Sequence, residues 1–144
     1  MKLSKTFRFE ASHLLSRHPG KCSRLHGHSW VLTVSVEGPV NPETGFVMDF
    51  ADISKCVEPL IERLDHRHLG EWNFEKGTGV VYSIHPNLGR VERMPLNLYP
   101  TSENLLLWIA GTLNIILLPW SELELEETCT SRAILTKREY AKTP

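Results

Sequence analysis

Histidines gather in one short stretch of the chain. Seven occur among 144 residues, and four of them, His13, His18, His26 and His28, lie within sixteen residues. A neutral imidazole nitrogen is a common protein ligand of zinc and related metals, and the same ring transfers protons near neutral pH. This stretch is therefore the first candidate for metal or acid–base chemistry.

Two alternating segments bring three of these rings together. Polar and apolar residues alternate over 3–13 and again over 26–38, which predicts two half-buried strands. If the strands pair antiparallel, the end of the first lies beside the start of the second. His13, His26 and His28 then point to the same, largely apolar face.

Three imidazoles that converge on an apolar wall suit a transition metal, most often zinc. Three protein ligands with no obvious fourth leave one position open for water or substrate, which is the catalytic pattern. The alternative is that these are ordinary half-buried histidines at strand ends. We interpret His18, in the loop between the strands, as a solvated residue.

Cys22 lies in the same loop, four residues before His26. A cation nearby would lower the pKa of the thiol and make a thiolate available as a base or nucleophile. Cys22 is alternatively a fourth metal ligand, which would make the site structural.

Two acidic residues farther along the chain also suggest chemistry. Asp65 precedes His66 at the end of a predicted helix, where the carboxylate can orient the imidazole for proton transfer; the same pair is also a routine helix terminus.

Alternation over 121–129 points Glu127 inward with the neighbouring leucines. A buried carboxylate needs a partner: an Arg or Lys of the protein, or the adjacent N–H groups of a ligand such as an amino-pyrimidinone. A third option is that the strand ends at Glu126 and leaves Glu127 exposed.

Helical spacing predicts two helices that position these groups. The first begins near Asp49, and either Asp49 or Asp52 can cap it. Pro59 should kink or break this helix. The second begins at Thr101 or Ser102 and ends before Pro119. The apolar faces are Ile53, Val57, Leu60, Ile61 and Leu64 in the first helix, and Leu105, Trp108, Ile109, Leu113 and Ile116 in the second.

Turn signals and short alternating runs complete the predicted order of elements. A turn over 41–45 and a short strand over 46–48 precede the first helix, and a hairpin of 80–84 with 90–94 separates the helices. Two closing strands follow, at 121–129 and 132–138. Strands, helix, hairpin, helix and strands in this order indicate an α+β fold with a mostly antiparallel sheet.

Composition sets limits on function. The chain of 16.5 kDa is 41% hydrophobic and 23% charged, as expected for a single domain spanning residues 1–144. A net charge of −1 argues against direct binding of nucleic acid. No apolar run approaches the ~20 residues of a membrane span. Three irregularly spaced cysteines fit a reducing cytoplasm.

Taken together, the motifs resemble the 6-pyruvoyl-tetrahydropterin synthase superfamily. They occur in the order Phe9–His13, Cys22–His28, Leu64–His66, Pro100–Glu103 and Glu127–Thr130. Three residues separate the cysteine from His-Gly-His, as in the carboxy-type enzymes of the queuosine and deazapurine pathway, whereas animal-type pyruvoyl synthases have five. The chain is therefore most similar to the carboxy-type branch.

The resemblance implies the tunnelling fold, in which an antiparallel four-stranded sheet is backed by two helices. Subunits of this fold assemble into a barrel, so a homo-oligomer is expected and a hexamer is favoured. The segment 70–99 departs from the family pattern, and we interpret it as an insertion that carries the hairpin between the helices.

The resemblance also implies roles for individual residues. Zinc would be bound by His13, His26 and His28. Cys22 would be the general base, and Asp65 and His66 would complete the proton-transfer set. The pterin ring would be held by Glu127 with help from Thr101, Ser102 and Glu103.

The implied reaction converts 7,8-dihydroneopterin triphosphate to 6-carboxy-5,6,7,8-tetrahydropterin, acetaldehyde and triphosphate. A sibling activity on the same scaffold, 6-pyruvoyl-tetrahydropterin synthesis, is the first alternative. A non-catalytic zinc- or pterin-binding module with Cys22 on the metal is the second. A metal-independent thiol hydrolase built from Cys22, His66 and Asp65 is the third.

Overall fold

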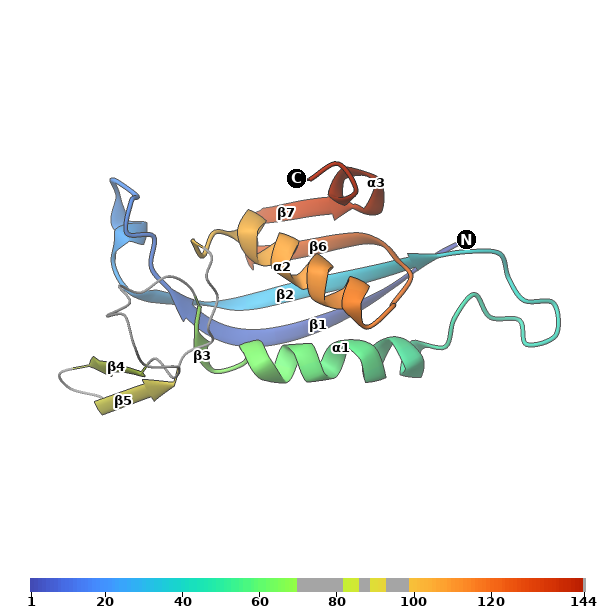
Figure 1. Ribbon diagram of the computed structural model, residues 1–144, viewed down its shortest axis with the longest axis horizontal. Coiled ribbons are helices and arrows are strands. Elements are labelled where there is room, and N and C mark those ends of the chain that lie inside the picture. The colour runs from blue at the N-terminus through green and yellow to red at the C-terminus, as the bar shows by residue number, and fades with distance from the viewer. Residues whose placement is uncertain (70–81, 86–88, 93–98, 144) are drawn as a thin grey trace.

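A computed structural model describes residues 1–69, 82–85, 89–92 and 99–143. Its main sheet has five strands in the order β3-β1-β2-β6-β7, and β4 and β5 form a separate hairpin (Figure 1). The strands are β1 (Lys2–His13), β2 (His26–Glu37), β3 (Arg67–His68), β4 (Tyr82–His85), β5 (Gly89–Glu92), β6 (Trp120–Thr128) and β7 (Ser131–Thr136). The helices are η1 (Lys21–Ser23, a 3₁₀ turn), α1 (Phe50–Leu64), α2 (Ser102–Ile115) and α3 (Lys137–Tyr140).

The two N-terminal strands pair as the alternation predicts. β1 and β2 are antiparallel over their whole length, with His13 opposite His26 and Ala11 opposite His28. Every second side chain is buried from Phe7 to His13 and from Trp30 to Val36, including Phe9 and Trp30, whose rings stack. Because a shift of one residue would expose this apolar set, the hydrophobic pattern itself specifies the register.

Both long helices cover the same face of the sheet. α1 packs against β1, and α2 packs against β6 and β7 (Figure 1). Their buried residues join the inward strand residues in one hydrophobic core. The predicted apolar faces are confirmed except for Ile116, which lies just beyond the end of α2 and is exposed.

The sheet has five strands where the resemblance implied four. The fifth, β3, comprises two residues that run parallel to β1 after the chain turns at Asp65 and His66. Backbone N–H groups of His66 and Leu69 donate to the carbonyls of Glu10 and Ser12. These hydrogen bonds satisfy part of the otherwise unpaired outer edge of β1.

Pro59 does not break the first helix, so of the predicted kink or break, the break is wrong. α1 runs without interruption from Phe50 to Leu64 with Pro59 inside it. Pro59 and Lys55 are both exposed, so the Lys55 carbonyl that the proline cannot bond faces water. The burial of Val57 and Leu60 on the opposite side holds the helix together.

The predicted N-cap of α1 is confirmed, and it sets a testable contribution to stability. The Asp49 side chain accepts a hydrogen bond from Ala51 N at 2.7 Å. Asp49→Ala should therefore lower the free energy of unfolding by about 1 kcal/mol, measured by urea denaturation. Asp52→Ala is the matched control, because Asp52 lies in the same turn without serving as the cap. Equal losses in the two variants would contradict the assignment.

One predicted strand is absent, and one predicted strand boundary is wrong. Residues 46–48 form no strand; they follow a turn in which Gly45 adopts φ 76° and donates to the Asn41 carbonyl. The last strand ends at Thr136 and not at 138, because Thr136 and Glu139 form a capping box that begins α3.

The predicted hairpin between the helices is present in the described residues as the antiparallel pair of β4 and β5. The outer ends of the two predicted strands, and most of segment 70–99, lie outside the described residues. No helix in the described ranges is long and apolar enough to cross a membrane.

Candidate metal centre and active site

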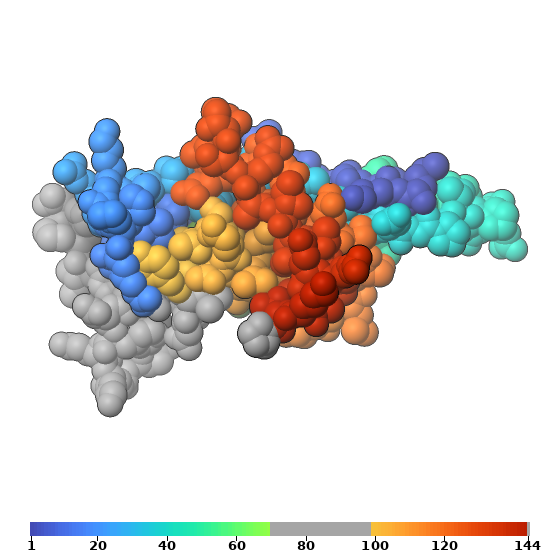
Figure 2. Space-filling model, turned by 90° about the horizontal axis from the view of Figure 1, so that it is seen from above, coloured from blue at the N-terminus to red at the C-terminus, as the bar shows by residue number. Residues whose placement is uncertain are grey.

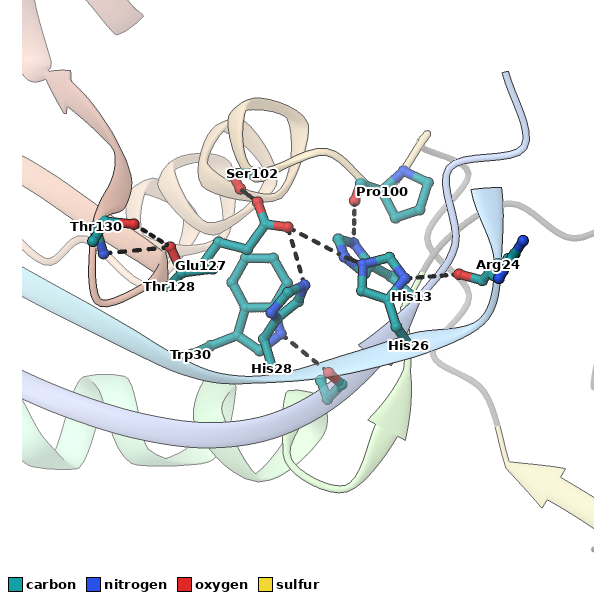
Figure 3. Close-up of polar contacts among 11 residues, drawn as sticks. His13, Arg24, His26, His28, Trp30, Pro100, Ser102, Glu127, Thr128 and Thr130 are labelled. Carbon is teal, nitrogen blue, oxygen red and sulfur yellow. Dashed lines mark hydrogen bonds and ion pairs between the residues drawn. The ribbon is translucent and has the colours of Figure 1, made fainter. Parts of the chain in front are cut away.

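Three histidines and a glutamate converge at one end of the sheet (Figure 3). One donor atom from each of His13, His26, His28 and Glu127 lies within 4.8 Å of all the others. The Nε2 atoms of His13 and His26 are 3.1 Å apart. Glu127 Oε1 lies 3.4 Å from His13 Nε2 and 3.1 Å from His28 Nε2. β1, β2 and β6 thus deliver the donors to one point.

Backbone carbonyls orient two of the imidazole rings. His13 Nδ1 lies 2.8 Å from the carbonyl of Pro100, and His26 Nδ1 lies 2.7 Å from the carbonyl of Arg24. A carbonyl only accepts, so both Nδ1 atoms must carry hydrogen. In the neutral rings, the two Nε2 atoms then present lone pairs to each other, an arrangement that a cation between them would stabilise.

The donor set fits a tetrahedral metal such as zinc. Zinc–ligand bonds of about 2.0–2.1 Å place neighbouring donors of a tetrahedron about 3.3–3.4 Å apart. The separations of 3.1 Å (His13 to His26), 3.1 Å (His28 to Glu127) and 3.4 Å (His13 to Glu127) are close to that edge length. His28 Nε2 is also buried without a hydrogen-bond partner among the described residues, although Glu127 is near. A metal would satisfy this atom.

The surroundings of the donors are apolar on one side. His13 is fully buried, and the Trp30 ring packs edge-on against both His13 and His28. Burial lowers the pKa of His28, because the charged imidazolium loses solvation there. The neutral form, which is the form that binds metals, is thereby favoured.

Glu127 is inward, as the alternation predicts, but its partners are histidines and a serine. The alternative that the strand ends at Glu126 and leaves Glu127 exposed is wrong, because β6 continues to Thr128. An irregularity in the β6–β7 register falls between Glu126 and Thr128, and such bulges re-aim side chains. Neither Arg nor Lys pairs with Glu127 among the described residues.

Ser102 holds the second carboxylate oxygen of Glu127. Its hydroxyl donates to Glu127 Oε2 at 2.5 Å, from the first turn of α2 (Figure 3). The contact with His13 and the bond from Ser102 lower the pKa of Glu127 to about 2, against the opposing effect of burial. Glu127 is therefore a carboxylate at neutral pH.

The other two predicted pterin-binding residues lie beside Ser102 but take different positions. Thr101 caps α2, and its side chain accepts from Asn104 N at 3.3 Å. Glu103 is exposed in the first turn. The metal-donor group includes neither residue in the described part of the chain.

Cys22 lies in η1, half-exposed, within the loop that precedes the histidine pair. Its carbonyl accepts from Leu15 N at 2.8 Å. Arg17 fastens the same loop to the start of α2, because its N–H donates to the Tyr99 hydroxyl and its guanidinium lies over the Tyr99 ring. The loop and the start of α2 adjoin at one end of the molecule (Figure 2). Among described residues, Cys22 is outside the donor group.

Asp65 and His66 lie at the outer edge of β1 rather than in the cluster. Asp65 Oδ1 accepts from Glu10 N, and Oδ2 is 2.8 Å from His66 Nδ1. In the described ranges, neither residue bonds to Cys22 or Glu127. His66 has φ 56°, a left-handed conformation that costs about 1–2 kcal/mol for a non-glycine residue. It borders a hollow of about 370 Å³ shared with Glu10 and Ser29.

The Asp65 carboxylate predicts a small pH dependence of stability. Its pKa lies below the ordinary 3.8, first because Glu10 N donates to it and then because of His66. A lowered folded-state pKa contributes stability that is complete above pH 4 and is lost as the pH falls through the folded value. The side chain is 39% exposed, so the contribution is at most a few tenths of a kcal/mol.

Asp65→Asn should therefore flatten the dependence of unfolding free energy on pH below about 4. Urea titrations at a series of acidic pH values measure the slope. Asp52→Asn is the matched control, since it makes the same chemical change at an exposed carboxylate whose partner is Lys55 and not a histidine. An unchanged slope in Asp65→Asn would contradict the assignment.

Comparison with known proteins agrees with this fold and site. The family model for 6-pyruvoyl tetrahydropterin synthase matches residues 2–138. The 6-carboxy-5,6,7,8-tetrahydropterin synthase of Synechocystis is 36% identical over 135 residues, covering 90% of this chain and 88% of the relative. The protein of the same name from Aquifex aeolicus is 31% identical, covering 72% and 73%. The structure of Caenorhabditis elegans 6-pyruvoyl tetrahydropterin synthase is 23% identical with a TM-score of 0.71, covering 94% of each chain.

The fold is the α+β tunnelling fold, with a group of four side chains that could hold a metal ion at one end of its sheet. The chain belongs to the 6-pyruvoyl tetrahydropterin synthase family. The similarity to the carboxy-type branch that the cysteine spacing predicted is confirmed by the curated relatives.

Proposed function

We propose that the protein is a zinc-dependent lyase acting on 7,8-dihydroneopterin triphosphate. The products would be 6-carboxy-5,6,7,8-tetrahydropterin, acetaldehyde and triphosphate, in queuosine or deazapurine biosynthesis. The observation that carries the proposal is the convergence of three imidazole Nε2 atoms and a carboxylate oxygen on one point. The names of the curated relatives support the choice of reaction.

His13, His26 and His28 would hold the zinc ion. Bound there, zinc would supply Lewis acidity that stabilises negative charge on side-chain oxygens of the substrate. The carbonyls of Pro100 and Arg24 keep two of the rings oriented, which is the usual support for metal-ligating histidines.

Cys22 would remove a carbon-bound proton from the substrate side chain. Its half-exposed place in the turn that precedes the histidine pair along the chain supports this role. Basic residues of the same loop, Arg17, Lys21 and Arg24, are candidates for the triphosphate. Glu127 would recognise the N–H groups of the pterin edge in a charge-assisted bidentate pair, and Thr101, Ser102 and Glu103 would line that position.

Asp65 and His66 would return protons, and this role requires assembly. Both residues sit at the exposed edge of β1 and make no bond to Cys22 in the described ranges. A second copy of the chain, docking there, would bring its own metal site to this His66. We therefore propose a homo-oligomer, with a hexamer favoured, whose pockets are completed between subunits.

The remaining parts of the proposal concern context. We propose one domain over residues 1–144, with 70–99 as an insertion, acting in the cytoplasm. The partner is a small pterin triphosphate and not nucleic acid, because the chain carries a net charge of −1.

The test is turnover of 7,8-dihydroneopterin triphosphate by the zinc-loaded protein, with acetaldehyde and 6-carboxy-tetrahydropterin measured as products. Formation of 6-pyruvoyl-tetrahydropterin without acetaldehyde would identify the sibling activity instead. Full activity after exhaustive chelation would contradict a zinc enzyme. Binding of pterin without any turnover would indicate a non-catalytic module.

A further inference from the structure

Glu127 faces two demands that one conformation does not meet. The proposed function, on which this inference rests, requires both carboxylate oxygens to accept N–H groups from a pterin edge. In the structure, Oε1 already faces His13 Nε2 and His28 Nε2, at 3.4 and 3.1 Å. Oε2 accepts from the Ser102 hydroxyl at 2.5 Å. Each oxygen has two lone pairs, and Oε1 already lies next to two nitrogens of the donor group.

The position of Oε1 is that of a fourth ligand. Its distances to two histidine nitrogens are close to the ligand–ligand edge of a tetrahedral zinc site, about 3.3–3.4 Å. The four donors form the compact group, and three nitrogens with one carboxylate oxygen are an ordinary zinc set. Without Glu127, the fourth corner would be open to water.

We infer that Glu127 closes the metal site when no pterin is bound and opens it when its carboxylate turns to the pterin ring. The turn breaks one coordinate bond from Oε1 and creates two hydrogen bonds to the ligand, with no net change in charge or electrons. The fourth coordination position then becomes available to the substrate side chain. Glu127 thus confers specificity, because the fourth coordination position of the metal opens only when a pterin is bound.

Ser102 supports this motion from one side. Its hydroxyl belongs to the first turn of α2, whose backbone N–H groups also favour negative charge nearby. A carboxylate held by Oε2 can rotate Oε1 away from the histidines while it keeps one contact with the protein. Both positions therefore leave Glu127 charged and partnered.

The first experiment measures metal affinity in full-length protein. Glu127→Gln should weaken Zn²⁺ binding at least about tenfold, since even residues that only support a ligand cost 10–100-fold when changed. Glu126→Gln is the matched control: it removes the same charge from the neighbouring residue of β6 and should bind Zn²⁺ as the wild type does. Circular dichroism checks that both variants are folded.

The second experiment detects the displacement directly. Co²⁺ replaces Zn²⁺ as a spectroscopic probe, and unsubstituted pterin, which has no side-chain hydroxyl, is titrated into the protein. The visible Co²⁺ bands should change in the wild type and in Glu126→Gln, and stay constant in Glu127→Gln. Because coupling between two ligands is reciprocal, pterin should also bind more tightly to the metal-free wild type than to the loaded protein.

The outcomes separate this inference from the proposed function. Wild-type Zn²⁺ affinity in Glu127→Gln, or pterin binding with unchanged Co²⁺ bands, overturns the inference while turnover of dihydroneopterin triphosphate still stands. A band change of equal size in Glu127→Gln also overturns it, because the pterin would then be contacting the metal directly. Weakened Zn²⁺ affinity in a correctly folded Glu127→Gln variant supports the inference that Glu127 is a metal ligand, even if the protein has no lyase activity.

Discussion

Replacing His26 by alanine is expected to lower Zn²⁺ affinity by more than about 100-fold and to reduce turnover to background. The change removes one of the converging nitrogen donors and leaves His13 Nε2 without its neighbour at 3.1 Å. Losing a residue that merely supports a ligand costs 10–100-fold, so losing the ligand itself should cost more. Competition with a chromogenic chelator measures the affinity, and product formation measures turnover.

His26 suits this test because the change should spare the fold. The side chain is half-exposed, whereas His13 is fully buried and its loss would leave a cavity in the core. His18→Ala is the matched control, since His18 lies exposed in the same loop and its ring accepts from the nearby Gly20 N. Retained zinc affinity in His26→Ala, or an equal loss in His18→Ala, would contradict the assigned metal centre.

Replacing Cys22 by alanine is expected to reduce kcat by about 10²–10⁴-fold while zinc content stays at the wild-type level. A positioned acid or base contributes a factor of this size. Metal should remain because the donor group consists of three histidines and Glu127, without Cys22. Single-turnover kinetics and metal analysis of the same preparation give the two quantities.

Cys129→Ala is the matched control for the thiol. Cys129 is exposed in the turn between β6 and β7. A Cys22→Ala protein that loses zinc would instead support the alternative that Cys22 is a fourth ligand of a structural metal site. One that keeps full turnover would remove Cys22 from the mechanism altogether.

The fold could be predicted where local pattern and burial agree. Alternation placed Phe9, Trp30 and Leu125 on the buried face, because a strand that covers a core must follow a period of two. That Pro59 leaves α1 unbroken could not be predicted, since its exposure to water depends on how the helix is rotated against the sheet. The two-residue β3 carries too little pattern to be predicted.

The candidate site divides in the same way. His13, His26 and His28 could be brought together from spacing and strand pairing alone. The partners of Glu127 could not be predicted from the sequence. Its approach to the histidines depends on an irregularity in the pairing of β6 and on the hydrogen bond from Ser102 at the start of α2. The sequence contained an inward carboxylate but no signal for what it meets.

By itself, the sequence determined which side chains share a face and which family the motifs resemble, because strand periodicity and residue spacing are local properties. The tertiary structure decided which groups from distant segments meet. Pro100 orients His13 across 87 residues of sequence, and Glu127 reaches the histidines from another strand. Asp65 and His66, by contrast, end at an exposed edge. Such contacts arise from the order of strands in the sheet and from packing of helices on it, which no local pattern encodes.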